Sequence, residues 1–258
     1  MDMKLAGRTA LITGASKGIG FSIAQMLAAE GCNLHLVARS RQDLEKAREK
    51  LRGQVDVEIH ALDIAKRGVP TQLAASCPDI DILVNNAGSI PRGSLEEIDE
   101  DRWREAWDLK VFGYINMCRE YYRLMKARRK GVIINILGNG GEAVDAGYIA
   151  GAAGNASLMA FSRALGGQSP KDGIRVIGLN PGPVATDRLI ALMKKEATSR
   201  LGDPERWREF EKGFPFGRAA TVEEIAATVV LLASDHSSYT TGTVVTIDGG
   251  IVNRGSLI

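Results

Sequence analysis

A glycine-rich turn near the N-terminus is the first stretch whose residue types suggest chemistry. An apolar run at 9–12 leads into Thr13, and a helical pattern follows the turn. The turn contains Gly14, Ser16, Lys17, Gly18, Ile19 and Gly20. Glycines let a pyrophosphate approach the backbone amides, whose partial positive charge at a helix N-terminus favours an anion. The turn therefore predicts a dinucleotide site, although an ordinary strand-to-helix turn has a similar composition.

Two basic residues indicate which dinucleotide would bind. A site for NAD places Asp or Glu after the second strand, but this chain has Ala38, Arg39 and Ser40 there. Arg39 can hold a 2′-phosphate bidentately, and Lys17 adds a second positive charge. The pair predicts NADP(H) rather than NAD(H), unless both are solvated surface charges. Asp63, after the third strand, is expected to accept from the adenine amino group or to cap the following helix.

Four motifs, in order along the chain, resemble those of the short-chain dehydrogenase/reductase family. They are 13–20, 85–88, 180–182 with Thr186, and Gly242 with 248–250. The resemblance covers nearly the whole chain. It implies that 85–88 stabilise the sheet beside the adenine ribose and that 181–186 run along the nicotinamide. The cofactor residues that it adds are Asn86, Ala87, Gly88, Pro181, Gly182 and Thr186.

Members of this family typically use an Asn, a Ser, a Tyr and a Lys for catalysis, and this chain keeps only the tyrosine. Tyr148 stands at the start of the helix after the fifth strand, where its hydroxyl could give a proton to a carbonyl as hydride arrives. A free tyrosine has a pKa of about 10, so proton exchange near neutrality needs a neighbouring cation. The position of the family's lysine, one helical turn on, is Ala152.

The serine and asparagine positions have also changed. Gly138 stands where the serine would orient the substrate carbonyl, and Asn139 either donates a hydrogen bond to that oxygen or belongs to a flexible glycine loop. Lys110 stands at the helix asparagine position. We predict that its ammonium enters the space left by Ala152 and lowers the pKa of Tyr148 or holds the nicotinamide ribose. The alternative is that it reaches solvent or pairs with a nearby carboxylate.

Alternating strands and helices are expected to position these residues. Apolar runs predict strands at 10–12, 33–38, 55–62, 80–84, 132–136, 174–179 and 243–247. Helical patterns occupy 18–30, 41–51, a stretch from about 66, 99–129, 147–166 and 222–233. The order predicts right-handed crossovers and an α/β fold, in which residues 1–258 form a single domain around one Rossmann-type doubly wound parallel sheet of about seven strands. The charged helical segment 184–216 is predicted to be a substrate lid.

Composition and charge narrow the class of partner. The 258 residues carry 33 basic and 31 acidic side chains, a net charge of +2, which gives no basic surface for nucleic acid or a membrane. No uncharged apolar run reaches the ~18 residues of a membrane helix and no signal pattern precedes the first strand, so we expect a cytoplasmic protein. Cys32, Cys77 and Cys118 lack metal-site spacing. The three histidines are not expected to form a set either, so no metal is predicted.

Three functions are consistent with these residues. The first is an NADP(H)-dependent oxidoreductase that transfers hydride between nicotinamide and a small carbonyl or alcohol substrate, with Tyr148 as acid/base. The second, favoured by the loss of Ser and Lys, is an NADP-binding sensor or partner subunit without reductase chemistry. The third is an unusual reaction in the same pocket.

Self-association is a further expectation. The family resemblance implies a homotetramer or homodimer formed through the long helices after the fourth and fifth strands. The second of these helices carries small residues that would either allow close packing between copies or face the sheet: Ala150, Gly151, Gly154, Ala156 and Ala160.

Overall fold

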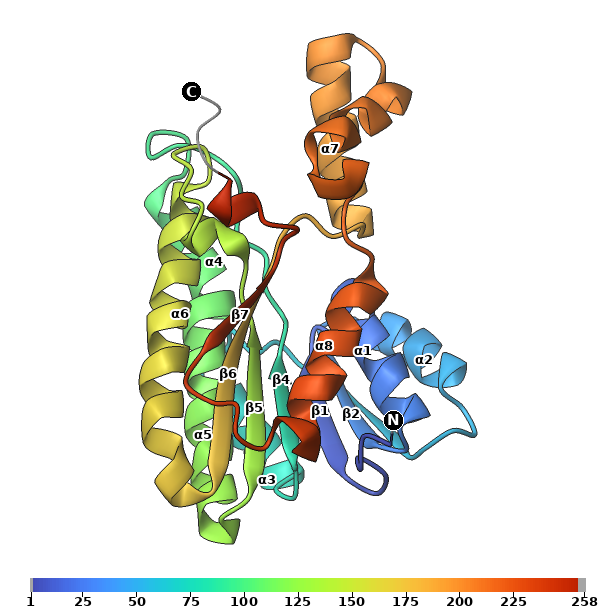
Figure 1. The fold of residues 1–258 in the computed structure, drawn as a ribbon, viewed down its shortest axis with the longest axis vertical. Helices are drawn as coiled ribbons and strands as arrows, with labels where there is room; N and C mark the ends of the chain where they lie inside the picture. Colours follow the sequence, from blue (N-terminus) through green and yellow to red (C-terminus); the bar gives the residue numbers. More distant parts are fainter. Residues whose placement is uncertain (1, 255–258) are drawn as a thin grey trace.

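The computed structural model describes residues 2–254, which contain one parallel sheet of seven strands in the order β3-β2-β1-β4-β5-β6-β7 (Figure 1). The strands are β1 (Thr9–Thr13), β2 (Asn33–Ala38), β3 (Val57–Ala61), β4 (Ile82–Asn85), β5 (Gly131–Ile136), β6 (Ile174–Pro181) and β7 (Val244–Ile247). The strand order reverses between β1 and β4, and ligands of such sheets bind beyond the carboxyl ends of the strands at that point. The predicted Rossmann-type doubly wound sheet is confirmed.

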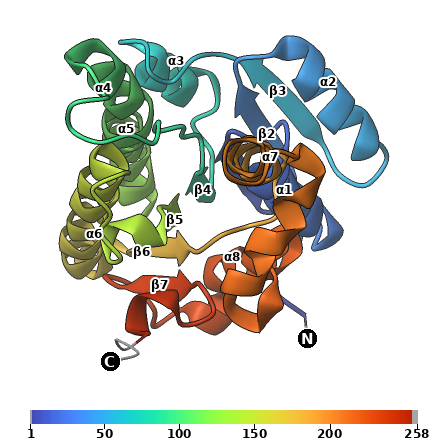
Figure 2. The ribbon, with the colours of Figure 1, turned by 90° about the horizontal axis from the view of Figure 1, so that it is seen from above.

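Two layers of helices cover the sheet (Figure 2). One face carries α1 (Gly18–Ala29), α2 (Arg41–Lys50) and α8 (Val222–Ala233). The other carries α3 (Val69–Ser76), α4 (Glu100–Trp107), α5 (Gly113–Arg128) and α6 (Ile149–Gln168). Side chains alternate along each strand, so Ile12 packs in the first layer and its neighbour Leu11 in the second. β4 and β5 are buried along their whole length, as expected for a sheet covered on both faces.

The helix predicted at 99–129 is interrupted in its middle. α4 ends at Trp107 and α5 begins at Gly113, and the residues between them, Asp108–Phe112, form a π-helical segment that contains Lys110. Such segments re-aim side chains and often occur at functional sites. The helix predicted from about 66 begins instead at Val69, because Gly68 is in the left-handed conformation with φ 83°.

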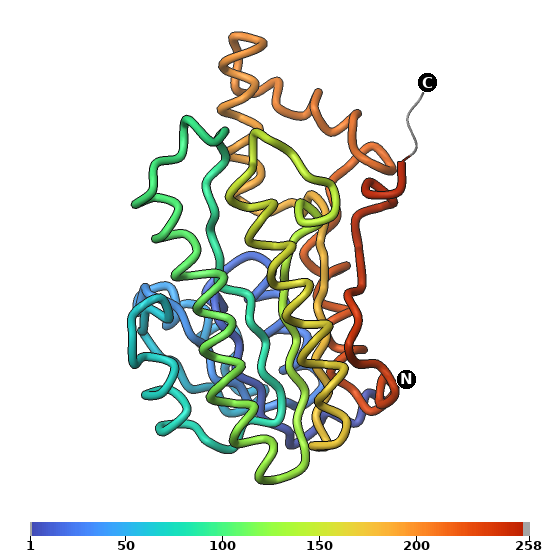
Figure 3. The backbone as a smooth tube through the Cα atoms, turned by 90° about the vertical axis from the view of Figure 1, so that its left-hand side faces the viewer, coloured from blue at the N-terminus to red at the C-terminus, as the bar shows by residue number. Residues whose placement is uncertain are grey.

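The segment 184–216 rises above the carboxyl ends of the strands (Figures 1 and 3). Its main element is α7 (Asp187–Leu201), and a 3-10 helix, Pro204–Gly213, packs back against α7. The Thr186 hydroxyl accepts a hydrogen bond from the amide of Leu189 and so fixes the point at which α7 begins. This segment is therefore helical, as its sequence predicted.

Among the residues described, no helix combines the length and the apolar character that crossing a membrane requires.

Candidate active site

The glycine turn and the first turn of α1 form an anion-binding geometry at the switch point. Lys17 is the N-cap of α1, but its side chain makes no capping hydrogen bond, which leaves the first amides of the helix free. Gly14 has φ 67°, and a Cβ there would lie 2.9 Å from the Cα of Ala87. A Cβ on Gly20 would lie 2.3 Å from the carbonyl oxygen of Gly14. Glycine is therefore required for this close approach.

Asn86 and Ala87 are held against the end of β1. Thr13 Oγ1 accepts from the backbone amides of Asn86 (2.9 Å) and Ala87 (3.0 Å), and Asn86 Nδ2 donates to the carbonyl of Thr13 at 3.1 Å. Asn85 Nδ2 donates to Asn135 Oδ1 of β5 at 2.9 Å. These bonds join the ends of β1, β4 and β5, which is the sheet-stabilising role expected for this motif.

A cleft of about 310 Å³ lies over these strand ends. Its lining includes most of the predicted cofactor residues, namely Gly14, Ser16, Lys17, Arg39, Asp63, Asn86, Ala87 and Gly88. Lys17 and Arg39 are exposed on its border and place two positive charges there.

The remaining predicted cofactor residues lie at the start of α1 and at the end of β6. Gly18 and Ile19 begin α1, and a Cβ on Gly18 would lie 3.5 Å from Thr186 Cγ2. Pro181 ends β6, and the amide of Gly182 donates to the carbonyl of Ile247 at 2.9 Å. The fold therefore brings the N-terminal glycine turn beside the 181–186 segment.

Asp63 lines the cleft, but it does not cap the following helix, because the N-cap of α3 is Gly68. Its Oδ1 accepts from the amide of Ala65 at 3.1 Å, in the turn that precedes α3, and the residue also lines the cleft. The carboxylate thus has a local structural role and a free side toward the cleft.

Tyr148 lies with its ring against the first turn of its own helix. A Cβ on Gly151 would lie 1.9 Å from the ring carbon Cζ, and a Cβ on Gly140 would lie 3.2 Å from Cδ1 and Cε1. The two glycines therefore leave a slot that the ring fills. Burial raises the pKa of Tyr148, against the opposing effects of Arg188, the Asn155 amide and Arg92. The hydroxyl therefore remains protonated at neutral pH.

Asn155 is a site residue that sequence reasoning missed. It is 1% exposed, and its Nδ2 donates to the carbonyl of Gly151 at 2.8 Å, while its Oδ1 has no hydrogen-bond partner among the described residues. A Cβ on Gly138 would lie 3.3 Å from this Nδ2, so the amide fills the space toward which a side chain at 138 would point. A buried polar atom without a partner is costly and needs a reason. The signal in the sequence was an Asn in the first two turns of a helix whose neighbouring residues there are Ile, Ala and Gly.

Lys110 points into the protein. Its Nζ donates to the carbonyl oxygen of Leu137 at 2.9 Å, and its Cδ would lie 2.7 Å from a Cβ on Gly88. The stem thus crosses from the π-helical segment, past the end of β4, to the end of β5. Burial, and secondarily the charge of Arg188, lower the pKa of Lys110 to about 8. The alternative that this lysine reaches solvent or a carboxylate is therefore wrong.

Arg188, in the first turn of α7, supplies the cation that sequence reasoning assigned to Lys110. Its guanidinium donates to the carbonyls of Gly88 (3.4 Å) and Ile90 (2.8 Å), and its charge lowers the pKa of Tyr148. Arg92 adds a second charge, with its Cζ 5.7 Å from the centre of the Tyr148 ring. The expected electrostatic partner of Tyr148 is thus replaced by two arginines, because the Lys110 ammonium is directed to Leu137.

Asn139 and Ala152 complete the set of predicted positions. Asn139 belongs to a short 3-10 helix, Asn139–Gly141, rather than to an irregular loop, and its Nδ2 donates to Asp248 Oδ2 at 3.4 Å. Ala152 is buried within α6. The side chain of Asn139 is therefore engaged with the C-terminal segment.

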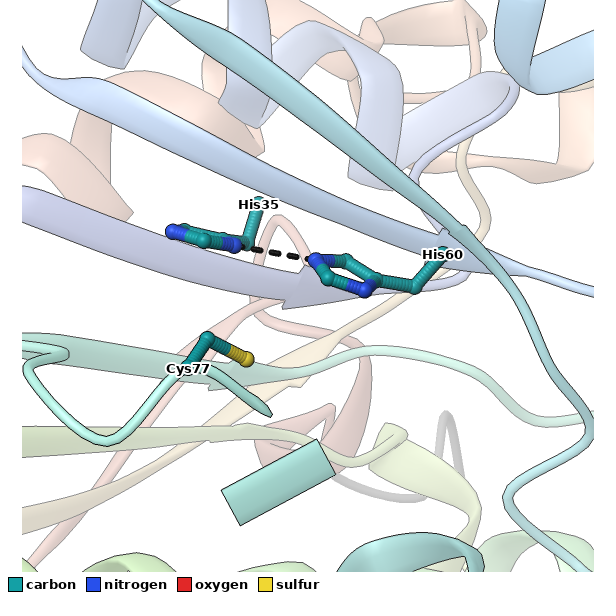
Figure 4. A group of neighbouring side chains, drawn as sticks. All are labelled: His35, His60 and Cys77. Atoms are coloured by element: carbon teal, nitrogen blue, oxygen red, sulfur yellow. Dashed lines mark hydrogen bonds between the residues drawn. The ribbon is translucent and has the colours of Figure 1, made fainter. Parts of the chain in front are cut away.

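The structure corrects the expectation that the histidines form no set. His35 of β2 and His60 of β3 lie side by side, with Nδ1 of the first 2.9 Å from Nε2 of the second, and Cys77 approaches both (Figure 4). Residues 35, 60 and 77 are far apart in the sequence, and only the parallel pairing of β2 with β3 under α3 brings them together.

A comparison with protein families gives a match over residues 14–252 to a model described as enoyl-(acyl carrier protein) reductase. The chain is also similar to 3-oxoacyl-(acyl-carrier-protein) reductase FabG of Chlamydia trachomatis, with 34% identity over 257 residues that cover 97% of this chain and 100% of the relative. It is 32% identical over 252 residues to the galactitol 2-dehydrogenase (L-tagatose-forming) of Cereibacter sphaeroides, covering 96% of each.

Among solved structures, the chain is similar to the L-sorbose reductase of Gluconobacter frateurii, which was crystallised with NADPH and L-sorbose. The TM-score is 0.91 and the identity 32%, over 99% of this chain and 100% of the other. This likeness extends over the sheet, both helical layers and the segment above the strand ends.

Proposed function

The chain belongs to the short-chain dehydrogenase/reductase family and is an oxidoreductase of that type, and from this premise we propose that it reduces a carbonyl group of a small molecule with NADPH. The observation that carries the proposal is the Tyr148 hydroxyl, which sits in its slot with a raised pKa. A protonated phenol is the form that gives a proton to a substrate oxygen. At neutral pH Tyr148 is therefore in the proton-donating form that reduction of a carbonyl needs.

The cleft fits NADP(H). The uncapped amides of α1 and the close approach at Gly14 suit a pyrophosphate, and the border charges of Lys17 and Arg39 suit a 2′-phosphate. The residues that would hold the cofactor are Gly14, Ser16, Lys17, Gly18, Ile19, Gly20, Arg39, Asp63, Asn86, Ala87, Gly88, Pro181, Gly182 and Thr186. A bound NADPH supplies the hydride.

Tyr148 and Asn155 act together at the reacting oxygen. The phenol donates its proton to the substrate oxygen, and the second hydrogen of the Asn155 amide supports the oxygen of Tyr148 as negative charge develops there. Asn155 thus supports Tyr148 from the space beside Gly138. Asn139 is a weak candidate for orienting the substrate carbonyl, which is the role of the family's serine, because Asp248 already accepts a hydrogen bond from it.

Arg188 and Lys110 provide the positive charge of the pocket. Arg188 limits the rise in the pKa of Tyr148 that burial causes. Lys110, whose ammonium lies at the end of β5, holds the nicotinamide ribose and the developing charge of the substrate. Arg188, with Arg92, thus supplies to Tyr148 the charge of a lysine at position 152, where this chain has Ala152, and Lys110 adds a separate cation at the end of β5.

One observation favours a second function. The predicted catalytic set has Gly138, Ala152 and Lys110 where the family uses Ser, Lys and Asn. A protein that binds NADP(H) in the same cleft without turnover, as a sensor or partner subunit, would keep the cleft and tolerate these changes. An unusual reaction in the same pocket would also tolerate them.

The test compares binding with turnover in the same protein. Purified wild-type protein and Tyr148→Phe are titrated with NADPH and NADH, and consumption of each is followed with ketoses, 3-oxoacyl thioesters and cyclic ketones. We expect both proteins to bind NADPH more tightly than NADH, and the phenylalanine variant to lose at least ~100-fold in kcat. NADPH binding without consumption of any carbonyl would support the binding protein instead.

The segment 184–216 is the lid of this site in our proposal. Thr186, the N-cap of α7, lies beside the glycine turn, and Arg188 already joins α7 to the loop after β4. Substrate specificity would then depend on the aromatic residues of the lid, Trp207, Phe210 and Phe214.

A further inference from the structure

Outside the cofactor cleft, a compact group of metal-binding side chains lies on the face of the sheet that α3 covers. His35 comes from β2, His60 from β3 and Cys77 from the residue that ends α3, and their ligand atoms lie within 4.8 Å of one another (Figure 4). Glu58 is opposite His35 in the strand register, with its Oε2 3.7 Å from His35 Nδ1. We propose that His35, Glu58, His60 and Cys77 bind a structural zinc ion.

The strand register explains why three of the ligands share one face. His35 pairs with Glu58 and Val37 with His60 in the parallel ladder of β2 and β3. Residues two apart on a strand point to the same side, so Glu58 and His60 project beside His35. Cys77 then approaches from the helical layer above, so the ligand atoms of His35, His60 and Cys77 form one group, and Glu58 reaches the edge of this group at His35.

The distance between the two histidine nitrogens is close to that of a zinc site, and Cys77 Sγ lies within 4.8 Å of a ring nitrogen of each histidine. Zinc binds His nitrogen at about 2.0–2.1 Å and Cys sulfur at about 2.3 Å, so a tetrahedral ion separates two nitrogens by about 3.3 Å. The observed separation of His35 Nδ1 and His60 Nε2 is 2.9 Å. A small rotation of the two imidazole rings supplies the remaining few tenths of an ångström.

The ligands are in, or easily reach, the protonation states that a metal needs. Burial lowers the pKa of both histidines, so both rings are neutral at pH 7, and a zinc ion would take the place of the hydrogen that one ring donates to the other in their 2.9 Å contact. Burial raises the pKa of the Cys77 thiol, and a bound zinc ion would displace its proton. The Tyr121 hydroxyl lies 3.2 Å from Cys77 Sγ and can donate to the resulting thiolate.

The charges of this ligand set would balance those of a zinc ion. A zinc ion with one thiolate and one carboxylate has no net charge, which limits the cost of placing it under a helix. Cys77 is 4% exposed and the side chain of His35 is 15% exposed, whereas Glu58, at 70%, gives an ion a path from solvent. Cys and His ligands in tetrahedral reach favour zinc over magnesium or calcium.

The site would join β2, β3 and α3 just below the cofactor cleft. Two residues after His60 stands Leu62, followed by Asp63, and four residues after His35 stands Arg39; all three line the cleft. The ion has four protein ligands and no open position, so its role is to stabilise the fold rather than to react with substrate.

The experiment uses the full-length protein after treatment with a chelator. Titration with zinc chloride should bind one ion per chain and raise the melting temperature, and cobalt(II) should give a thiolate-to-metal absorption band. Cys77→Ser and His60→Gln should each weaken zinc binding by more than about 100-fold, and Cys77→Ser should abolish the band. Cys32→Ser is the matched control, because that buried thiol lies in the other layer and should leave zinc binding unchanged.

Two results would overturn the proposal: no stoichiometric binding, or equal binding by wild type, Cys77→Ser and His60→Gln. If the two core variants do not fold, Glu58→Gln keeps the test decisive because its side chain is exposed. The proposed four-ligand site requires that this variant binds zinc about tenfold or more weakly, and unchanged affinity would contradict it.

Discussion

Tyr148 is positioned by two neighbouring glycines, which have no side chains. The ring fits between Gly140 and Gly151 because neither has a side chain, and a methyl group at 151 would overlap the ring. Gly138 acts in the same way, because its missing side chain leaves room for the amide of Asn155. At this site, small residues allow larger polar ones from the same helix to approach one another.

Replacing Asn155 tests its role beside Tyr148. Asn155→Leu has a similar shape; it removes a buried oxygen without a partner but also the 2.8 Å hydrogen bond to the Gly151 carbonyl, and because these two effects oppose each other the melting temperature should change little. In steady-state kinetics, kcat should fall roughly 10- to 100-fold with the NADPH affinity unchanged. Ser157→Ala, on the exposed side of the same helix, is the control. A kcat equal to that of wild type would show that Asn155 only packs.

Lys110 should give the reaction its pH dependence. Burial disfavours the charged amine and lowers its pKa to about 8, so the ammonium is complete below that value and is lost as the pH rises through it. If the ammonium holds ribose and substrate, kcat/KM should fall as the pH rises through about 8. Lys110→Met keeps the apolar stem and should give a lower rate without this step. A step that persists in Lys110→Met would assign the ionisation to another group.

At the scale of elements, the break between α4 and α5 and the start of α7 meet over the strand ends. The π-helical segment directs Lys110 inward, and the first turn of α7 directs Arg188 to the carbonyls of Gly88 and Ile90. The two hydrogen bonds of Arg188 attach α7 to the loop after β4. The proposed lid is therefore held by a side chain that also acts on the pKa of Tyr148.

Removing this contact should loosen the lid and the site together. Arg188→Ala loses hydrogen bonds to two carbonyls, so hydrogen exchange in 187–201 should become faster and the substrate KM should rise about tenfold or more. Lys195→Ala, on the exposed surface of α7, changes the same charge and should alter neither. Unchanged exchange in Arg188→Ala would mean that α7 is held by other contacts.

At the scale of the whole molecule, α6 divides its small residues between two faces. Ala150, Gly151 and Gly154 are buried inside the chain, and the indole nitrogen of Trp107 donates to the carbonyl of Ala150 at 3.0 Å. Ala160 faces outward, so part of the small-residue set expected at an interface is used within one chain. The outward face, which also carries exposed Ala153, Ser157 and Ala164, stays available for a second copy.

This arrangement predicts the effect of a bulky charge on the outer face of α6. In a homodimer or homotetramer packed through α5 and α6, Ala160→Arg places a charge where two helices approach closely, and the mass from light scattering should fall toward that of one chain. Ala160→Ser keeps the size and should keep the assembly. An unchanged mass for the arginine variant would place the interface elsewhere.

The sequence by itself determined the sheet, its order of elements and the cofactor cleft. These features depend on local patterns: apolar runs, glycines at fixed spacing, and Arg39 directly after a strand. Parallel strands bring their carboxyl ends to one edge of the sheet. The alternation of strands and helices along the chain therefore brings residues 14, 39, 63 and 86 together. The helical character of residues 184–216 likewise depends on the local sequence.

Only the tertiary structure decided where the long side chains point and which distant residues meet. The π-helical segment turned Lys110 toward Leu137, and α7 brought Arg188 to Tyr148 from forty positions away. Asn155 became part of the site through Gly138, and His35, His60 and Cys77 met through strand register. Such contacts depend on how the helices and strands pack against one another. The free energy of that packing comes from the whole core, so the contacts cannot be predicted from residue spacing along the chain.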